Sequence, residues 1–223
     1  MTTFAFKLST LIVTAVAAAT ILFAAGCATQ QSPTTNAAAA SKPADDKTLA
    51  NLMEAYNGES NASAKYKEYA KKADEEGFTK VASLFRAASR AEEIHLNNHA
   101  VVIQKMGGTP KADIKIPEIK STEENLKSAI TGETYERDTM YTDFMLEARR
   151  VGNKDALRTF NFAKQAEAEH AKLYGEALAN LSKWRDGKLT FFVCPSCGYT
   201  TSDANLGKCP VDFTPKEKFE AIS

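Results

Sequence analysis

Two Glu-x-x-His pairs constrain the fold of this chain more than any other feature of its sequence. They are Glu92 with His95 and Glu167 with His170, in a chain that has only three histidines. Residues three apart lie on the same face of a helix, so each pair offers a carboxylate and an imidazole to one point. Both pairs fall in stripes of apolar residues that step by three and four, which is the pattern of a helix face turned toward a core. The fold must therefore bury charged groups at its centre.

Between residues 47 and 187 the sequence is helical almost throughout, and glycines divide it into four long segments. A glycine just after the last apolar position is a frequent helix end. Ser121 opens a capping box with Glu124, and Asn153 is a suitable N-cap residue. We predict helices over about 48–76, 79–106, 121–152 and 154–187.

The connection between the second and third segments, residues 107–120, is the longest of the three and contains Pro110 and Pro117. Short loops join antiparallel neighbours, whereas a long connection can cross the bundle. One long central crossover is the ferritin-like arrangement. The prediction is an all-α, ferritin-like four-helix bundle over residues 47–187.

Glutamates stand near the middle of all four predicted apolar stripes. An ionised carboxylate in an apolar core costs several kcal/mol unless it is paired, and the stripes carry too few lysines and arginines to neutralise this set. Two divalent metals would do so, as in a di-iron or di-manganese carboxylate centre. The predicted ligands are Glu59, Glu92, His95, Glu133, Glu136, Glu167 and His170. We interpret His99, one turn beyond His95, as a supporting group or a core histidine rather than as a ligand.

These motifs resemble the di-iron motifs of the rubrerythrin family. The matching segments are Gly58-Glu59-Ser60, Glu92-x-x-His95, Gly132-Glu133-x-x-Glu136 and Glu167-x-x-His170. The resemblance extends from about residue 47 to the C-terminus. It implies that one iron shifts between His95 and Glu136 as the oxidation state changes. It also implies that Tyr66 and Tyr141 lie beside the centre, with plain core packing as the alternative for both.

After Gly187 the pattern changes to β-branched and aromatic residues around a Cys-x-x-Cys-Gly knuckle, and we predict a small β-ribbon over residues 188–223. Its cysteines 194, 197 and 209 resemble three ligands of the rubredoxin-like site that ends typical rubrerythrins. Asp212 stands where the fourth cysteine would be. Three interpretations stay open: a Cys₃Asp iron site, a structural zinc site, or a metal-free ribbon whose first two cysteines are free or disulfide-linked. The candidate ligands are Cys194, Cys197, Cys209 and Asp212.

Residues 1–26 are typical of an export signal, with a basic residue before the uncharged apolar run 8–25. Small residues followed by Cys27 resemble a bacterial lipoprotein box, in which the cysteine is lipidated. An ordinary cleaved signal and a retained membrane anchor are the alternatives. Residues 27–46 are rich in Ala, Thr, Ser, Gln and Pro and predict a flexible tether. By resemblance to lipoprotein sorting, Ala28 favours the outer membrane, facing the periplasm.

We expect an exported di-iron peroxidase, an oxidoreductase that reduces hydrogen peroxide to water. The chain has 28 Lys+Arg and 28 Asp+Glu, which excludes the basic excess of a nucleic-acid-binding protein. The resemblance implies two irons, with manganese as an alternative metal, and a homodimer. It also implies re-reduction through the ribbon by a donor protein or membrane carrier that the sequence does not name. Two alternatives remain: a ferroxidase that handles iron with dioxygen, and a non-enzymatic metal- or redox-binding module. Glu136 favours peroxide.

Overall fold

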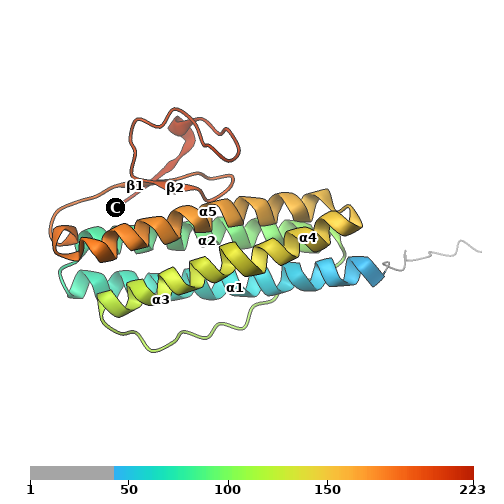
Figure 1. The fold of residues 1–223 in the computed structure, drawn as a ribbon, viewed down its shortest axis with the longest axis horizontal. Coiled ribbons are helices and arrows are strands. Elements are labelled where there is room, and N and C mark those ends of the chain that lie inside the picture. The colour runs from blue at the N-terminus through green and yellow to red at the C-terminus, as the bar shows by residue number, and fades with distance from the viewer. Residues whose placement is uncertain (1–42) are drawn as a thin grey trace, which may run out of the picture. The chain divides into compact units, whose positions relative to one another are not determined.

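The computed structural model describes residues 43–223; the predicted signal, Cys27 and most of the predicted tether lie outside the described residues (Figure 1). The elements, in chain order, are α1 (Pro43–Glu75), α2 (Thr79–Lys105), α3 (Thr122–Tyr135), the π-helix η1 (Glu136–Met140), α4 (Tyr141–Val151), α5 (Lys154–Ala179), the 3₁₀-helix η2 (Leu181–Trp184), β1 (Phe191–Val193), β2 (Thr200–Thr201), the 3₁₀-helix η3 (Lys216–Lys218) and β3 (Glu220–Ile222).

Four helical rods lie side by side in this part of the chain: α1, α2, the run from α3 through η1 to α4, and α5 (Figure 1). Short turns join α1 to α2 and α4 to α5, so each of these pairs is antiparallel. The long connection between α2 and α3 runs back along the bundle. This is the predicted four-helix arrangement with one central crossover.

The crossover is fastened to α1 by two asparagines. Asn57 Oδ1 accepts a hydrogen bond from the backbone N–H of Asp113 at 2.8 Å. Asn61 accepts from the N–H of Lys115 at 2.7 Å and donates to the carbonyl of Asp113 at 2.9 Å. These bonds satisfy backbone groups that a connection without secondary structure would otherwise leave to water.

The predicted helix signals are present, but two helix ends differ from the prediction. Ser121 and Glu124 form the capping box, and Asn153 accepts from the N–H of Ala156. The last helix ends at Ala179 rather than near residue 187, because Asn180 leaves helical geometry at φ −124° and ψ 28°. The first helix begins at Pro43, so residues 43–46 of the predicted tether are helical. Proline is well suited to a first helical turn, where its missing N–H is not needed.

The third predicted helix is not continuous, because η1 interrupts it. The backbone N–H of Tyr141 bonds to the carbonyl of Glu136, five residues back. This adds one residue to the turn and changes the direction of the side chains that follow. Glu136, a predicted ligand, is the first residue of the widened turn.

The apolar core of the bundle is divided into two clusters. One cluster includes Tyr66, Phe85 and Tyr174, and the other includes Leu52 and Phe160. Along α1 and α5 the predicted metal ligands fall between the two clusters in sequence order, and on α2 His95 does so. The charged groups are therefore enclosed by apolar layers along the helix axes.

The C-terminal ribbon is a three-stranded antiparallel sheet in the order β2-β1-β3. Figure 1 shows it lying along α2 and α5 of the same chain. Phe162 of α5 packs with Tyr199, Val211 and Phe219 around the three buried cysteines of the ribbon. Among the described residues, no helix is long and apolar enough to cross a membrane.

Candidate metal centre

Two groups of buried side chains meet in the middle of the bundle. One comprises Glu59, Glu92, His95 and Glu167, and the other comprises Glu92, Glu133, Glu167 and His170. Within each group the ligand atoms lie within 4.8 Å of one another. Glu92 and Glu167 belong to both groups. Each group offers three carboxylates and one imidazole, and the shared pair is placed to bridge two metals.

The two histidine rings point the same nitrogen into this cluster. His95 Nδ1 lies 2.8 Å from Glu92 Oε2 and 3.1 Å from Glu167 Oε1. His170 Nδ1 lies 2.9 Å from Glu167 Oε2 and 3.4 Å from Glu92 Oε1. Each imidazole therefore faces both shared carboxylates.

The cluster fits a pair of metal ions, because the protein leaves much of its bonding capacity unused. Among the residues that the structure describes, six buried atoms of these groups make no hydrogen bond, because even the 2.9 Å contact between His170 Nδ1 and Glu167 Oε2 lacks hydrogen-bond geometry. They are Glu59 Oε2, Glu92 Oε1, Glu133 Oε2, Glu167 Oε1 and Oε2, and His170 Nδ1. Buried polar atoms without partners are rare and costly, and oxygen and imidazole donors suit iron and manganese.

The pKa values of the cluster show that its excess of carboxylates favours the binding of positive charge. Burial and neighbouring carboxylates raise the pKa of Glu59 well above its usual range, and they raise the pKa of Glu133 to about 8. Burial alone would lower the pKa of His95 and of His170, but the surrounding carboxylates raise both well above normal. Burial opposes ionisation of Glu167, yet the two histidines lower its pKa. In the metal-free protein, protons supply the charge that metals would bring.

The ribbon orients both histidines through the ring nitrogen that points away from the cluster. His95 Nε2 lies 3.0 Å from the carbonyl oxygen of Cys197, and His170 Nε2 lies 3.1 Å from Thr200 Oγ1. A carbonyl only accepts, so His95 donates from Nε2. Thr200 donates its own proton to the carbonyl of Gly198 at 3.0 Å, so it accepts from His170. Both rings therefore keep Nδ1 for the cluster, which is how such partners fix a metal-binding tautomer.

The two predicted tyrosines contact predicted ligands. Tyr66 OH donates to Glu133 Oε1 at 2.6 Å, and Tyr141 OH donates to Glu59 Oε1. Both side chains are buried. The hydroxyls do more than fill the core, since each one holds a carboxylate of the cluster in place.

Glu136 occupies a different place from the other six predicted ligands. Among the described residues, neither four-residue group includes it. Its carboxylate faces the cluster from the start of η1, where burial and the charges of Glu133 and Glu167 raise its pKa well above normal. Its Oε1 lies 3.9 Å from the position that a Cβ on Gly58 would take. The structure thus places Glu136 beside the cluster.

The ribbon gathers a second candidate metal site. The ligand atoms of Cys194, Cys197, Cys209 and Asp212 lie within 4.8 Å of one another. Among the described cysteines all three are free, with 3.4 Å between the sulfurs of Cys197 and Cys209. Asp212 lies 3.6 Å from the sulfur of Cys194, and Thr214 fixes it through its backbone N–H and its hydroxyl. The aspartate therefore stands where a fourth ligand is needed.

Comparison with known proteins identifies the family. The rubrerythrin family model matches residues 50–178. Nigerythrin from Nitratidesulfovibrio vulgaris is 40% identical over 187 residues, covering 83% of this chain and 92% of nigerythrin. The chain belongs to the rubrerythrin family. Rubrerythrin-2 from Clostridium acetobutylicum is 35% identical, covering 77% of this chain and 94% of that protein.

Solved structures agree with this assignment. Nigerythrin in its fully reduced, all-ferrous state aligns with a TM-score of 0.74 at 37% identity, covering 78% of this chain and 86% of that chain. The bacterioferritin of Desulfovibrio desulfuricans aligns with a TM-score of 0.60 at 20% identity, which shows the shared fold alone. The predicted family and the ferritin-like fold are confirmed.

A di-iron centre is the cofactor that the family implies, and the bundle of this chain has the carboxylate and imidazole donors that such a cofactor needs. The ribbon adds a cysteine-rich cluster for a further metal. The assignment of each ligand stays a prediction that the geometry supports. Manganese stays an alternative in the bundle, and zinc in the ribbon.

Three contributors to the site were absent from the sequence prediction: Thr200, the carbonyl of Cys197, and Thr159, which lies 3.0 Å from His99 Nδ1. Threonine hydroxyls and carbonyls carry no motif, so no sequence signal marks them. His99 is bonded at both ring nitrogens, with Nε2 3.1 Å from Tyr141 OH. It supports the site rather than joining either ligand group, as predicted.

Proposed function

We propose that this member of the rubrerythrin family is a peroxidase that reduces hydrogen peroxide to water, consuming two protons and two electrons per peroxide. The observation that carries the proposal is the contact between the two candidate metal sites, in which His95 Nε2 donates to the carbonyl of Cys197 at 3.0 Å. His95 belongs to the bundle cluster, and Cys197 belongs to the ribbon cluster. A second metal site in contact with the bundle cluster could pass electrons to it, and a peroxidase needs two electrons for each peroxide that it reduces.

A bound di-iron centre would supply the two electrons and the Lewis acidity for cleaving the O–O bond. The protein would hold it through Glu92 and Glu167 as shared carboxylates, together with Glu59, His95, Glu133 and His170. The apolar clusters on either side keep bulk water out. In such surroundings fixed dipoles and charges act strongly.

Two phenols and one carboxylate complete the site. Tyr66 and Tyr141 fix Glu133 and Glu59 by hydrogen bonds. Glu136 stands beside the cluster, where burial and the charges of Glu133 and Glu167 raise its pKa well above normal. We propose that it adjusts its position relative to His95 as the charge of the centre changes.

The deciding experiment compares two oxidants. The full chain is loaded with Fe(II) without oxygen and mixed with hydrogen peroxide or with dioxygen, and the oxidation is followed by stopped-flow absorbance. We expect the reduced protein to be oxidised faster by peroxide than by dioxygen. Faster reaction with dioxygen would favour the ferroxidase alternative. A stable iron centre that reacts with neither would favour a non-enzymatic binding module.

We also propose that the protein is exported and lipid-anchored at Cys27, facing the periplasm from the outer membrane. The support is the sequence of residues 1–28 alone, which lie outside the described residues. Cell fractionation of the wild type and of Cys27→Ser tests it. The wild type should be in the outer-membrane fraction and the variant should lose membrane attachment. The electron donor would then be a redox protein or membrane carrier on that side.

A homodimer stays part of the proposal. The ribbon here contacts the bundle of its own chain, so both candidate sites are complete within one chain. Light scattering on the purified protein decides the oligomeric state. A dimer is the expected result.

A further inference from the structure

A line of hydrogen-bonded side chains leads away from the metal cluster. Tyr141 of α4 donates to Glu59 of α1. His99 of α2 has its Nε2 3.1 Å from the hydroxyl of Tyr141 and its Nδ1 3.0 Å from Thr159 Oγ1, on α5. All four side chains are buried. The line therefore crosses the whole bundle, with one residue from each helical rod.

The direction of these bonds follows from the chemistry of their ends. A carboxylate accepts, so Tyr141 gives its proton to Glu59, and the phenol oxygen must accept from His99 Nε2–H. In a neutral ring, Nδ1 then accepts from the hydroxyl of Thr159. Burial, and then the positive charge of His95, lowers the pKa of His99 to about 3, which keeps the ring neutral. Every donor in the line points toward Glu59.

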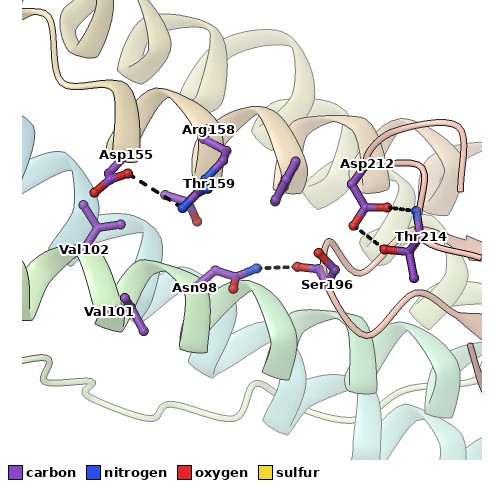
Figure 2. Close-up of a pocket in the computed structure, with 10 residues that line it drawn as sticks. Asn98, Val101, Val102, Asp155, Arg158, Thr159, Ser196, Asp212 and Thr214 are labelled. Carbon is purple, nitrogen blue, oxygen red and sulfur yellow. Dashed lines mark hydrogen bonds and ion pairs between the residues drawn. The ribbon is translucent and has the colours of Figure 1, made fainter. Parts of the chain in front are cut away.

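The far end of the line opens into a cavity of about 370 Å³ between α2, α5 and the ribbon, which Thr159 helps to line. Figure 2 shows Thr159 beside Arg158 and Asp155, with Asn98 and Ser196 across the cavity. Thr159 is 4% exposed, whereas His99 and Tyr141 are fully buried. A polar cavity of this size holds water, so Thr159 is the residue of the line that borders solvent.

We infer that Thr159, His99 and Tyr141 form a proton path from this cavity to Glu59. The inference rests on the proposed peroxide reduction, which consumes two protons inside a core that excludes water. A water proton reaches Thr159 Oγ1 as the threonine proton passes to His99 Nδ1. The Nε2 proton passes to Tyr141, and the tyrosine proton passes to Glu59 Oε1. One proton enters at Thr159, one arrives at Glu59 and no electron moves. Rotation of the hydroxyls and a flip of the His99 ring then restore the starting arrangement of protons.

Plain core packing does not account for this arrangement. Tyr141 has its partner in Glu59 and needs no second one, while Phe144 and Phe160 already pack against its ring. An apolar side chain in place of His99 would avoid burying two ring nitrogens, each of which costs free energy unless bonded. Proton transfer, in contrast, accounts for a line of polar side chains at this place.

The first test uses no catalysis. The full chain, with 15N-labelled histidine and with zinc in place of iron, is examined by NMR for exchange of the His99 ring N–H with water. In the Thr159→Val variant this N–H should exchange at least about tenfold more slowly, because water can then reach the ring only when the core opens. Thr131→Val, at an exposed threonine that bonds only to its own helix, is the control and should exchange as the wild type does. Equal rates in all three, or a ring protonated at Nδ1 instead of Nε2, would overturn the path.

The second test separates proton transfer from positioning. In His99→Gln the amide nitrogen can still donate to Tyr141, but it cannot pass a proton on. With iron content unchanged, oxidation of the reduced variant by peroxide should slow by about 100-fold. The wild-type rate would overturn the relay. Should the wild type itself be inert to peroxide, the proposed function fails, and the NMR result still decides the path.

Discussion

Gly198 lies so close to His95 that a Cβ on the glycine would stand 2.3 Å from Nε2 and 2.8 Å from Cδ2 of the ring. No real Cβ tolerates that distance. The glycine also has φ +79°, in the left-handed region that side chains disfavour. The absence of a side chain here lets the neighbouring carbonyl of Cys197 reach the ring. Ribbon and bundle are joined at this point.

Replacing Gly198 with alanine should separate the ribbon from the bundle at this contact. Steric overlap at this contact costs about 1–3 kcal/mol of unfolding free energy, and the positive φ adds to the loss. Urea unfolding measures it, and re-reduction of the bundle iron through the ribbon should slow as well. Gly152→Ala is the matched control, since Gly152 also has a positive φ, +77°, and no described neighbouring atom lies within 4 Å of its added Cβ. Equal unfolding midpoints for both variants would show that the close approach carries no energy.

Thr200→Val removes the acceptor for His170 Nε2–H at nearly constant volume. The ring would lose the bond that holds Nδ1 toward the cluster, and outer partners of this kind typically contribute about 10–100-fold to metal affinity. Competition with a chelator measures the change. Thr201→Val, next in the same strand, accepts only from the N–H of Asp203 and should bind metal like the wild type. Unchanged affinity in Thr200→Val would show that this ribbon residue does not contribute to metal binding in the bundle.

The helices and the central cluster could be predicted because their signals are local. Apolar spacing, glycine ends and the capping box depend on neighbouring residues. Glutamates within apolar stripes reveal a buried centre, since burial would otherwise be too costly. These features placed Glu59, Glu92 and Glu167 on inward faces before any helix was positioned.

The parts that the sequence did not reveal depend on contacts between distant segments. Nothing near Glu136 marks the widened turn that places it beside the cluster. Thr159 and Thr200 gain their roles only when α5 and the ribbon meet the histidines. The end of the last helix at Ala179 was also missed, because Asn180 stops it without the glycine that the prediction used.

The shared carboxylates should matter more for metal binding than Glu136. Glu92→Gln or Glu167→Gln removes a ligand from both groups at once, so both metals should be lost. Glu136→Ala leaves both groups whole, so metal should stay bound while peroxide turnover slows. Metal analysis and stopped-flow oxidation measure the two effects. Retention of two metals in Glu92→Gln would argue against bridging, and full turnover in Glu136→Ala would exclude its part in the reaction.

Stability of the metal-free protein should fall as pH rises. The pKa of Glu133 is about 8 in the folded protein, against 4.5 for an ordinary glutamate. Because the folded state holds this proton more tightly, its stabilisation is complete below the ordinary value and is lost as pH passes the folded one. The raised pKa values of His95 and His170 act in the same sense.

Melting curves of the metal-free protein from about pH 5 to about pH 9 should therefore show a falling midpoint. The metal-loaded protein should show a flatter profile, because metals replace the protons. Glu133→Gln, which cannot ionise, should reduce the slope in the metal-free form. A metal-free midpoint that rises over this range would contradict the charge balance of the cluster.

The ribbon site should depend on Asp212. Its carboxylate completes a set with three sulfurs, and oxygen is an acceptable fourth ligand for iron or zinc. After loading with Fe(II) without oxygen, the wild type should hold three irons per chain, one more than the two of the bundle. Asp212→Ala should hold two, and Asp212→Cys should bind the third iron more tightly because thiolates are its softer ligands. Asp203→Ala, an exposed aspartate of the same ribbon, is the control. Two irons in the wild type would mean that the ribbon does not relay electrons, and an external donor would have to reach the bundle directly.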